Sequence, residues 1–330
     1  MRYKIPCKEA GFYPSALAIL ERINVDDLEP NSKYYHPADT FLLAFTDAVE
    51  CLSRLADRIT NEMELARSGN RKKSPEDTLV RMDNIRLDVF SMIFHCGNFI
   101  EACQTIIKTL IHDNTKSAGK AAKEFNAMTE PYRSHVSKII NEIKHKHRRV
   151  RVLSADWGEN IILGYYIEGV VEKGLIGPDP LIHKRHGSIA TGYSLNWELQ
   201  NHLVNMYFTA MCLESALSKA IPHIKNLKAA NEVASNKTLN ENLSRHLSKI
   251  SEIPALYLPN EFSGAQYSVL KKGDNYELSN SNDKKPLNKK THPMNVSLST
   301  RVGLFNLGVE MPYYLPEPVS NALINKFHKN

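Results

Sequence analysis

FLLAFTDAVECLSRL, residues 41–55, places apolar side chains three and four positions apart, which is the spacing of an amphipathic helix. Phe41, Phe45 and Leu52 fall on one face of that helix and give it a side to bury. The pattern runs from about residue 38 to residue 68, where a polar, basic segment ends it. The stretch therefore predicts a long helix that needs an apolar partner.

A second long helix is predicted over residues 75–112. Ser74 is its expected N-cap, and Pro75 occupies the first helical position, where a missing N–H donor has no effect. Apolar residues recur at helical spacing along the whole segment. Because glycine weakens a helix interior, we expect a kink near Gly97.

A third helical pattern begins near residue 116 and contains Pro131. Proline cannot donate to the hydrogen-bond ladder, so we expect the helix to break there and to restart at Tyr132. A fourth long helix is predicted after Ser194, a residue type that caps helix N-termini well. Its sequence is apolar on more than one face, which indicates burial.

Other segments have the period and composition of strands. Residues 150–185 are rich in β-branched and aromatic residues around a turn at 156–160, which predicts a β-hairpin between the third and fourth helices. A shorter helix is expected over 236–251, followed by a hairpin that turns at Gly273 and Asp274. Further strands are expected within 296–312.

These elements predict a mainly α fold. It is a four- or five-helix bundle with an inserted β-hairpin and a small mixed or β-rich C-terminal region. The predicted division is an N-terminal extension over residues 1–37, the helical bundle over 38–252 and a C-terminal appendage over 253–330.

Composition restricts the class of protein. The chain has 330 residues, of which 42% are hydrophobic and 24% are charged, and a formal net charge of +6. The five cysteines lack CxxC spacing, which favours a reducing compartment. The first twenty residues lack the apolar run of a signal peptide, and Glu168 and Glu172 interrupt the most apolar later segment. We expect a cytoplasmic protein without a membrane partner.

Basic residues gather in KIINEIKHKHRRVRV, residues 138–152. At 3.6 residues per turn, Asn141, Lys144, His145 and Arg148 share one helix face, and Lys138 lies on the same face. A histidine that exchanges protons near neutral pH, beside cations that hold a phosphate, is the chemistry of metal-independent RNA cleavage.

RNA itself supplies a 2′-hydroxyl nucleophile, so the protein has only to move protons and neutralise charge. The predicted catalytic residues are His145, Asn141, Lys144 and Lys138, with His145 as acid or base. The predicted phosphate-binding residues are Arg148, Arg149 and Arg151.

Two other interpretations of this basic stretch stay open. Cations in the last turn of a helix complement the negative end of its dipole, each by ~0.3 to 1 kcal/mol, and that effect alone could account for them. The same cations could also contact a nucleic acid without catalysing any reaction.

IINEIKH, residues 139–145, follows a long helical pattern ending in FIEACQTIIKTLI and resembles the signature region of the HEPN superfamily. The family motif is an Arg, four to six residues and a His, commonly with Asn directly after the Arg. Asn141 and His145 match that motif, whereas Ile140 occupies the Arg position of the shortest spacing and Lys138 that of the longest. The resemblance covers about residues 38–225.

HEPN proteins are helical bundles, often dimeric, and many are RNA-cleaving toxins or antiviral effectors. The resemblance thus implies a homodimer that acts on RNA as a metal-independent endoribonuclease of a toxin or defence system, with no cofactor and no metal. The missing Arg favours a competing function, a catalytically inactive scaffold that dimerises or binds a protein partner.

Other motifs are less specific. His183 and His186 have a spacing that metal ligands can use, but no Cys, Asp or Glu partner stands nearby, so a basic loop is the favoured interpretation. Trp157, Tyr165 and Tyr166 could stack on bases or could be core residues of the hairpin. No glycine-rich phosphate loop and no GxSxG motif is present, which disfavours nucleotide hydrolysis and triad hydrolases.

Overall fold

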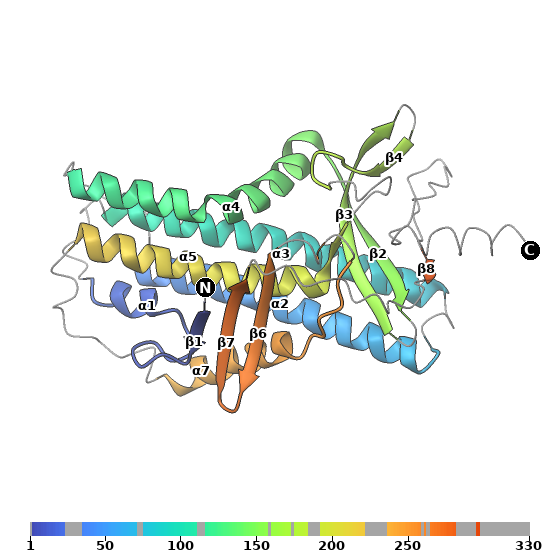
Figure 1. Ribbon diagram of the computed structural model, residues 1–330, viewed down its shortest axis with the longest axis horizontal. Coiled ribbons are helices and arrows are strands. Elements are labelled where there is room, and N and C mark those ends of the chain that lie inside the picture. Colours follow the sequence, from blue (N-terminus) through green and yellow to red (C-terminus); the bar gives the residue numbers. More distant parts are fainter. Residues whose placement is uncertain are drawn as a thin grey trace, which may run out of the picture.

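The computed structural model describes eleven segments of the chain (Figure 1), namely residues 2–23, 35–70, 75–110, 116–157, 160–172, 175–183, 192–221, 236–258, 261, 265–281 and 295–297. Their helices are α1 (Ser15–Leu20), α2 (Pro37–Arg67), α3 (Pro75–Leu110), α4 (Lys116–Lys146), α5 (Leu195–Ala220) and α7 (Lys237–Ser251). Their strands are β1 (Arg2–Ile5), β2 (Val150–Trp157), β3 (Asn160–Glu172), β4 (Leu175–Pro178), β5 (Tyr193–Ser194), β6 (Gln266–Lys272), β7 (Asn275–Ser281) and β8 (Asn295–Ser297). The predicted mainly α class is confirmed, and the strands form small antiparallel sheets.

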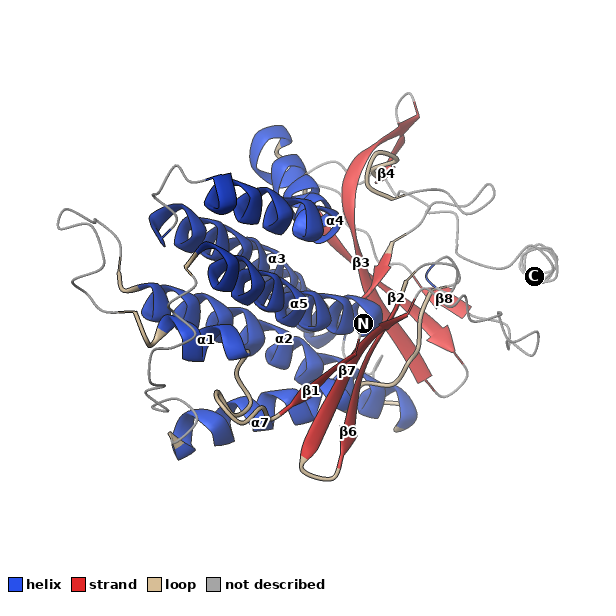
Figure 2. Cartoon of the chain, turned by 60° about the vertical axis from the view of Figure 1, so that its left-hand side comes forward, coloured by secondary structure: helices blue, strands red, loops and turns tan. Residues whose placement is uncertain are grey.

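The four long helices α2, α3, α4 and α5 lie side by side and form what we call the helical body (Figures 1 and 2). Its core is aromatic, because the ring of Phe99 from α3 packs edge-on against Phe41 and Phe45 from α2, and Tyr207 from α5 closes the cluster. All four side chains are buried. The apolar spacing of residues 41–55 therefore has the partner that it requires.

α4 runs through Pro131 without a break, so the predicted interruption at that residue is wrong. Proline removes one backbone donor but leaves the remaining ladder intact, and the helix bends near its middle (Figure 1). The apolar stripe continues beyond the bend, because Tyr132 and Val136 pack against Ile100 of α3. Burial on both sides of Pro131 thus outweighs the lost hydrogen bond.

α3 is likewise continuous through Gly97, where a kink was predicted. A Cβ atom at this position would lie 2.5 Å from the Cδ1 atom of Ile140 on α4. The missing side chain therefore lets α4 approach α3 closely, which is why a glycine fits here. The predicted Ser74 cap lies outside the described residues.

The predicted hairpin after α4 is confirmed: β2 and β3 pair antiparallel, with Val150 opposite Ile167, and cross one end of the helical body (Figure 1). β4 and β5 both pair with β3, and β8 pairs with β2. Of the further strands expected within 296–312, only the part in β8 lies within the described residues. This sheet holds the chain that leads from α4 to α5.

The second hairpin is also confirmed, with β6 and β7 joined at Gly273 in a left-handed conformation (φ 61°). The N-terminal strand β1 pairs with β7, so segments that lie more than 260 residues apart in the sequence share one three-stranded sheet. Ile5 and Leu278 belong to the same apolar cluster as the core of the helical body. The domain boundaries at residues 37 and 252 stay predictions.

Candidate functional site

The predicted catalytic residues lie on the C-terminal half of α4. Lys138, Asn141, Lys144 and His145 are all exposed. The Lys144 ammonium lies 5.1 Å from the centroid of the Phe94 ring, a cation–π contact. The structure thus places a basic, solvent-facing surface at this helix end.

Two of the three predicted phosphate-binding arginines lie beside carboxylates. Arg151 of β2 lies 2.5 Å from Glu168 of β3, and the Arg148 guanidinium lies 3.8 Å from Asp179. Arg149 is exposed. Arg149 therefore offers the freest charge of the three, whereas Arg151 mainly links the two strands of the hairpin.

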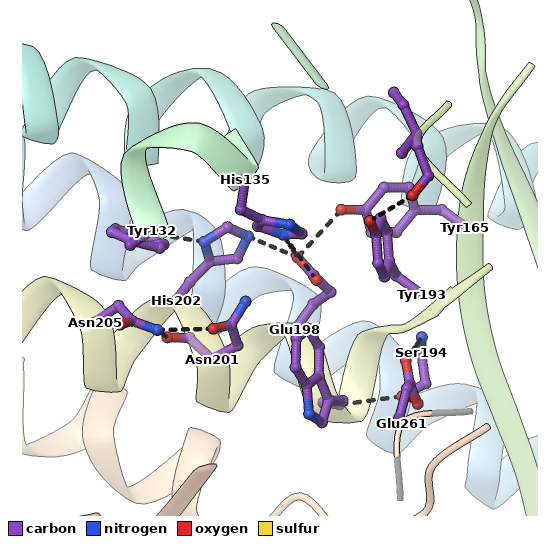
Figure 3. Close-up of polar contacts among 12 residues, drawn as sticks. Tyr132, His135, Tyr165, Tyr193, Ser194, Glu198, Asn201, His202, Asn205 and Glu261 are labelled. Atoms are coloured by element: carbon purple, nitrogen blue, oxygen red, sulfur yellow. Dashed lines mark hydrogen bonds and ion pairs between the residues drawn. The ribbon is translucent and has the colours of Figure 1, made fainter. Parts of the chain in front are cut away.

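A second group of polar side chains lies on the same helix and on α5 (Figure 3). The Nε2 atom of His135 lies 3.1 Å from Oε1 of Glu198, and Nε2 of His202 lies 2.8 Å from Oε2 of the same carboxylate. The Tyr165 hydroxyl donates to Oε2 of Glu198 at 3.2 Å. Glu198 and His202 are fully buried, so a charged group is held here in the protein interior by its neighbours.

The environment of this group shifts its proton equilibria. Burial alone would raise the pKa of Glu198, but the adjacent His135 and His202 hold that pKa well below its usual value. For His202 burial acts in the opposite direction and would lower the pKa, but the neighbouring Cys96 and Glu198 raise that pKa to about 10. Burial raises the pKa of Tyr165, which therefore stays a neutral donor. The carboxylate is thus ionised in the folded protein.

His135 also lines a pocket of about 610 Å³, a size typical of small-molecule sites. Aromatic rings and amides dominate its walls, with one buried carboxylate. The lining residues are Met128, Pro131, Tyr132, His135, Tyr193, Trp197, Asn201, Asn205, Phe208, Glu261, Ala265, Tyr267 and Asn280. We call this cavity the aromatic pocket.

Contacts among the lining residues hold the rings of the aromatic pocket in place. The indole N–H of Trp197 donates to the Ala265 carbonyl at 3.2 Å, and the Trp197 ring meets Tyr267 edge-on at 5.4 Å. Tyr193 packs parallel to Trp197 and meets His135 edge-on. Both rings are only partly buried, so they present faces to the cavity.

The first turn of α5 is fixed by a capping arrangement (Figure 3). Ser194 confirms its predicted role, since its hydroxyl accepts from the Trp197 backbone N–H. The buried Glu261 carboxylate accepts hydrogen bonds from Ser194 N, Ser194 Oγ and Leu258 N at 2.6–2.7 Å. Burial raises the pKa of Glu261 to about 8, against the lowering effect of these hydrogen bonds. This clamp positions the helix turn that carries Glu198.

Sequence reasoning missed this second group. It assigned no role to His135, and it passed over Glu198 and His202, although their separation by one helical turn on α5 was a readable signal. Tyr165 and Tyr166 are buried, which favours their core interpretation over base stacking. The Trp157 side chain lies outside the described ones.

Of the predicted His183–His186 pair, His183 lies within the described residues. His183 is buried, and its Nε2 atom accepts a hydrogen bond from the Ile167 backbone N–H at 2.8 Å. Burial lowers the pKa of His183 to about 3, so the ring is neutral. His186 lies outside the described residues.

Comparison with protein-family models, with curated proteins and with solved structures finds no match to this chain. Among the described helices, none combines the length and the apolar character that crossing a bilayer requires. Function must therefore be argued from the two groups of residues on α4 and α5.

Proposed function

We propose that the protein binds single-stranded RNA, with one unstacked base in the aromatic pocket and the adjoining phosphates on the basic end of α4. The observation that carries the proposal is the position of the pocket beside that basic surface. His135 lines the pocket, and Lys138 follows it by one turn of the same helix. The helical body would then be the four-helix bundle of a HEPN-like protein.

The walls of the pocket suit a nucleobase. Single-stranded RNA is recognised mainly through splayed bases that stack on aromatic rings and hydrogen-bond along their edges. Trp197 and Tyr193 offer ring faces, and the amides of Asn201 and Asn280 line the same cavity. Asparagine pairs with base edges because it carries both a donor and an acceptor.

The phosphates of the same strand would meet Lys138, Lys144, Arg148 and Arg149. For four phosphate contacts, the affinity for a single strand should fall roughly 50-fold between about 50 and about 200 mM salt. Anisotropy of a labelled single-stranded RNA measures this dependence. Affinity that does not change with salt would contradict the proposed phosphate contacts.

Pocket and surface can be tested separately. Trp197→Ala should weaken RNA binding roughly 5- to 150-fold, since stacking contributes about 1–3 kcal/mol per base. Tyr35→Ala removes an exposed ring from outside the pocket, and Lys237→Ala removes an exposed cation from α7, so both serve as controls that should bind normally. Equal binding by Trp197→Ala and Tyr35→Ala would refute the base pocket.

Cleavage of the bound strand at His145 is the catalytic form of the proposal. His145 would move the proton of the 2′-hydroxyl or of the leaving oxygen, and Lys144 would neutralise the phosphate. Wild-type protein and His145→Ala are incubated with RNA in excess chelator, after circular dichroism has shown that both are folded. Cleavage by the wild type alone supports catalysis, and absence of cleavage by both leaves RNA binding as the function.

A second candidate function is assembly with another copy of the chain. Val80, Leu87 and Phe90 are exposed apolar side chains seven and three positions apart, so they share one face of α3. Such a face is what a scaffold needs in order to dimerise. Light scattering should then report a dimer for the wild type and a monomer for Leu87→Glu, whereas a monomeric wild type would exclude this candidate.

A further inference from the structure

We propose that His135, Glu198 and His202 bind one divalent transition-metal ion beside the aromatic pocket, which His135 lines. The two imidazoles and the carboxylate come from α4 and from consecutive turns of α5, and they converge on one point (Figure 3). This inference is independent of RNA binding, because it concerns an ion and the buried side of the pocket.

The donor atoms are close enough to share an ion. One nitrogen of each histidine and one oxygen of Glu198 lie within 4.8 Å of one another. An ion bound at about 2.0–2.2 Å from each donor requires separations of roughly 3–3.5 Å between the donors. Oε2 of Glu198 lies 3.5 Å from His135 Nε2 and 2.8 Å from His202 Nε2, and both distances are near that range.

The orientation of His202 supports an ion more strongly than the distances do. Its Nδ1 atom lies 3.0 Å from the Tyr132 hydroxyl, a contact that fixes the ring. Its Nε2 atom is buried and, despite lying 2.8 Å from Glu198, has no partner with hydrogen-bond geometry. A metal ion beside Nε2 would satisfy that nitrogen, and the Tyr132 contact would be the outer hydrogen bond that metal-binding histidines usually make.

The carboxylate has a similar outer contact. The buried Tyr165 hydroxyl donates to Glu198 at 3.2 Å. This hydroxyl bonds to Oε2, and because a carboxylate oxygen has two lone pairs, the contact can orient the ligand while Oε2 still faces the ion. Tyr132 and Tyr165 are therefore positioning residues for the two ligands that come from α5.

The ligand set indicates the kind of ion and of site. Two imidazoles and one carboxylate suit Zn²⁺, Mn²⁺ or Fe²⁺, whereas Ca²⁺ requires six to eight oxygen ligands. Three protein ligands leave a coordination position open, which is the arrangement of catalytic rather than structural metal sites. The His135 side chain is 20% exposed and lines the pocket, so the open position can face the cavity.

The test uses the full-length protein, stripped of metal with chelator and dialysed, and titrated with Co²⁺ while absorption is recorded. One equivalent should bind per chain and give the visible bands of a protein-bound Co²⁺ ion, and Zn²⁺ should displace it. His135→Ala, at the edge of the pocket, and Glu198→Gln should each weaken binding by more than about 100-fold, and Tyr132→Phe by about 10- to 100-fold.

His145→Ala is the matched control, because it removes an exposed histidine of the same helix outside the proposed site. It should bind Co²⁺ as the wild type does. The inference is overturned if folded wild-type protein binds no Co²⁺ or Zn²⁺, or if His135→Ala binds as tightly as His145→Ala. Because no RNA is added, the Co²⁺ titration tests metal binding alone and its outcome does not depend on whether the protein binds RNA.

Discussion

Glu261 holds the start of α5, and its replacement by alanine should be strongly destabilising. The carboxylate accepts from two buried backbone N–H groups, those of Ser194 and Leu258, and from the Ser194 hydroxyl. A buried donor left without a partner costs about 1–3 kcal/mol, so two of them should lower the free energy of unfolding by about 4 kcal/mol. The hydroxyl can turn toward another acceptor and adds little.

Urea denaturation followed by circular dichroism measures this loss as a shift in midpoint at constant slope. Glu261→Gln keeps one acceptor oxygen and should lose about half as much as Glu261→Ala. Glu241→Ala removes an exposed carboxylate from α7 and should change stability by less than about 0.5 kcal/mol. A loss below about 1 kcal/mol for Glu261→Ala would refute the clamp.

Three further predictions concern packing and charge. His183 is buried and neutral, with a pKa of about 3 in the folded protein, and it takes up a proton on unfolding below pH ~6.5. Its contribution to stability is therefore present above that pH, and the free energy of unfolding falls by about 1.4 kcal/mol per pH unit as the pH is lowered from there toward the folded-state pKa. His183→Gln should remove that slope in urea melts. Gly97→Leu should destabilise by about 1–3 kcal/mol in thermal melts through collision with Ile140, whereas a neutral effect would mean that α3 and α4 are not in close contact. Arg81→Met removes the positive charge beside the buried Glu62 carboxylate and should lower the free energy of unfolding by about 3–5 kcal/mol. Wild-type stability of this variant would count against a buried charge at Glu62.

Periodicity predicted the helices because burial requires it. The stripe around Phe41 and Phe45 had to meet another apolar face, and a glycine followed by aspartate between two alternating segments marked the turn at Gly273. The break at Pro131 was wrong because local propensity opposed tertiary burial and burial was stronger. Sequence patterns thus locate elements better than they locate interruptions.

The sequence could not predict that His135, Glu198 and His202 lie together. Glu198 and His202 stand one turn apart, but His135 is 63 positions away from Glu198 on another helix. Their contact depends on how α4 is rotated and shifted against α5, which the period of a single helix does not determine. By contrast, the basic end of α4 was readable because all of its residues share one helix.

Base stacking on Trp197 is the central claim, and intrinsic fluorescence tests it most directly. The chain contains two tryptophans, so in a Trp157→Phe variant only Trp197 remains to be observed. Titration with a short single-stranded RNA should quench this fluorescence with the same midpoint as anisotropy, because a stacked base contacts the indole. RNA binding that leaves the Trp197 emission unchanged would contradict a base in the aromatic pocket.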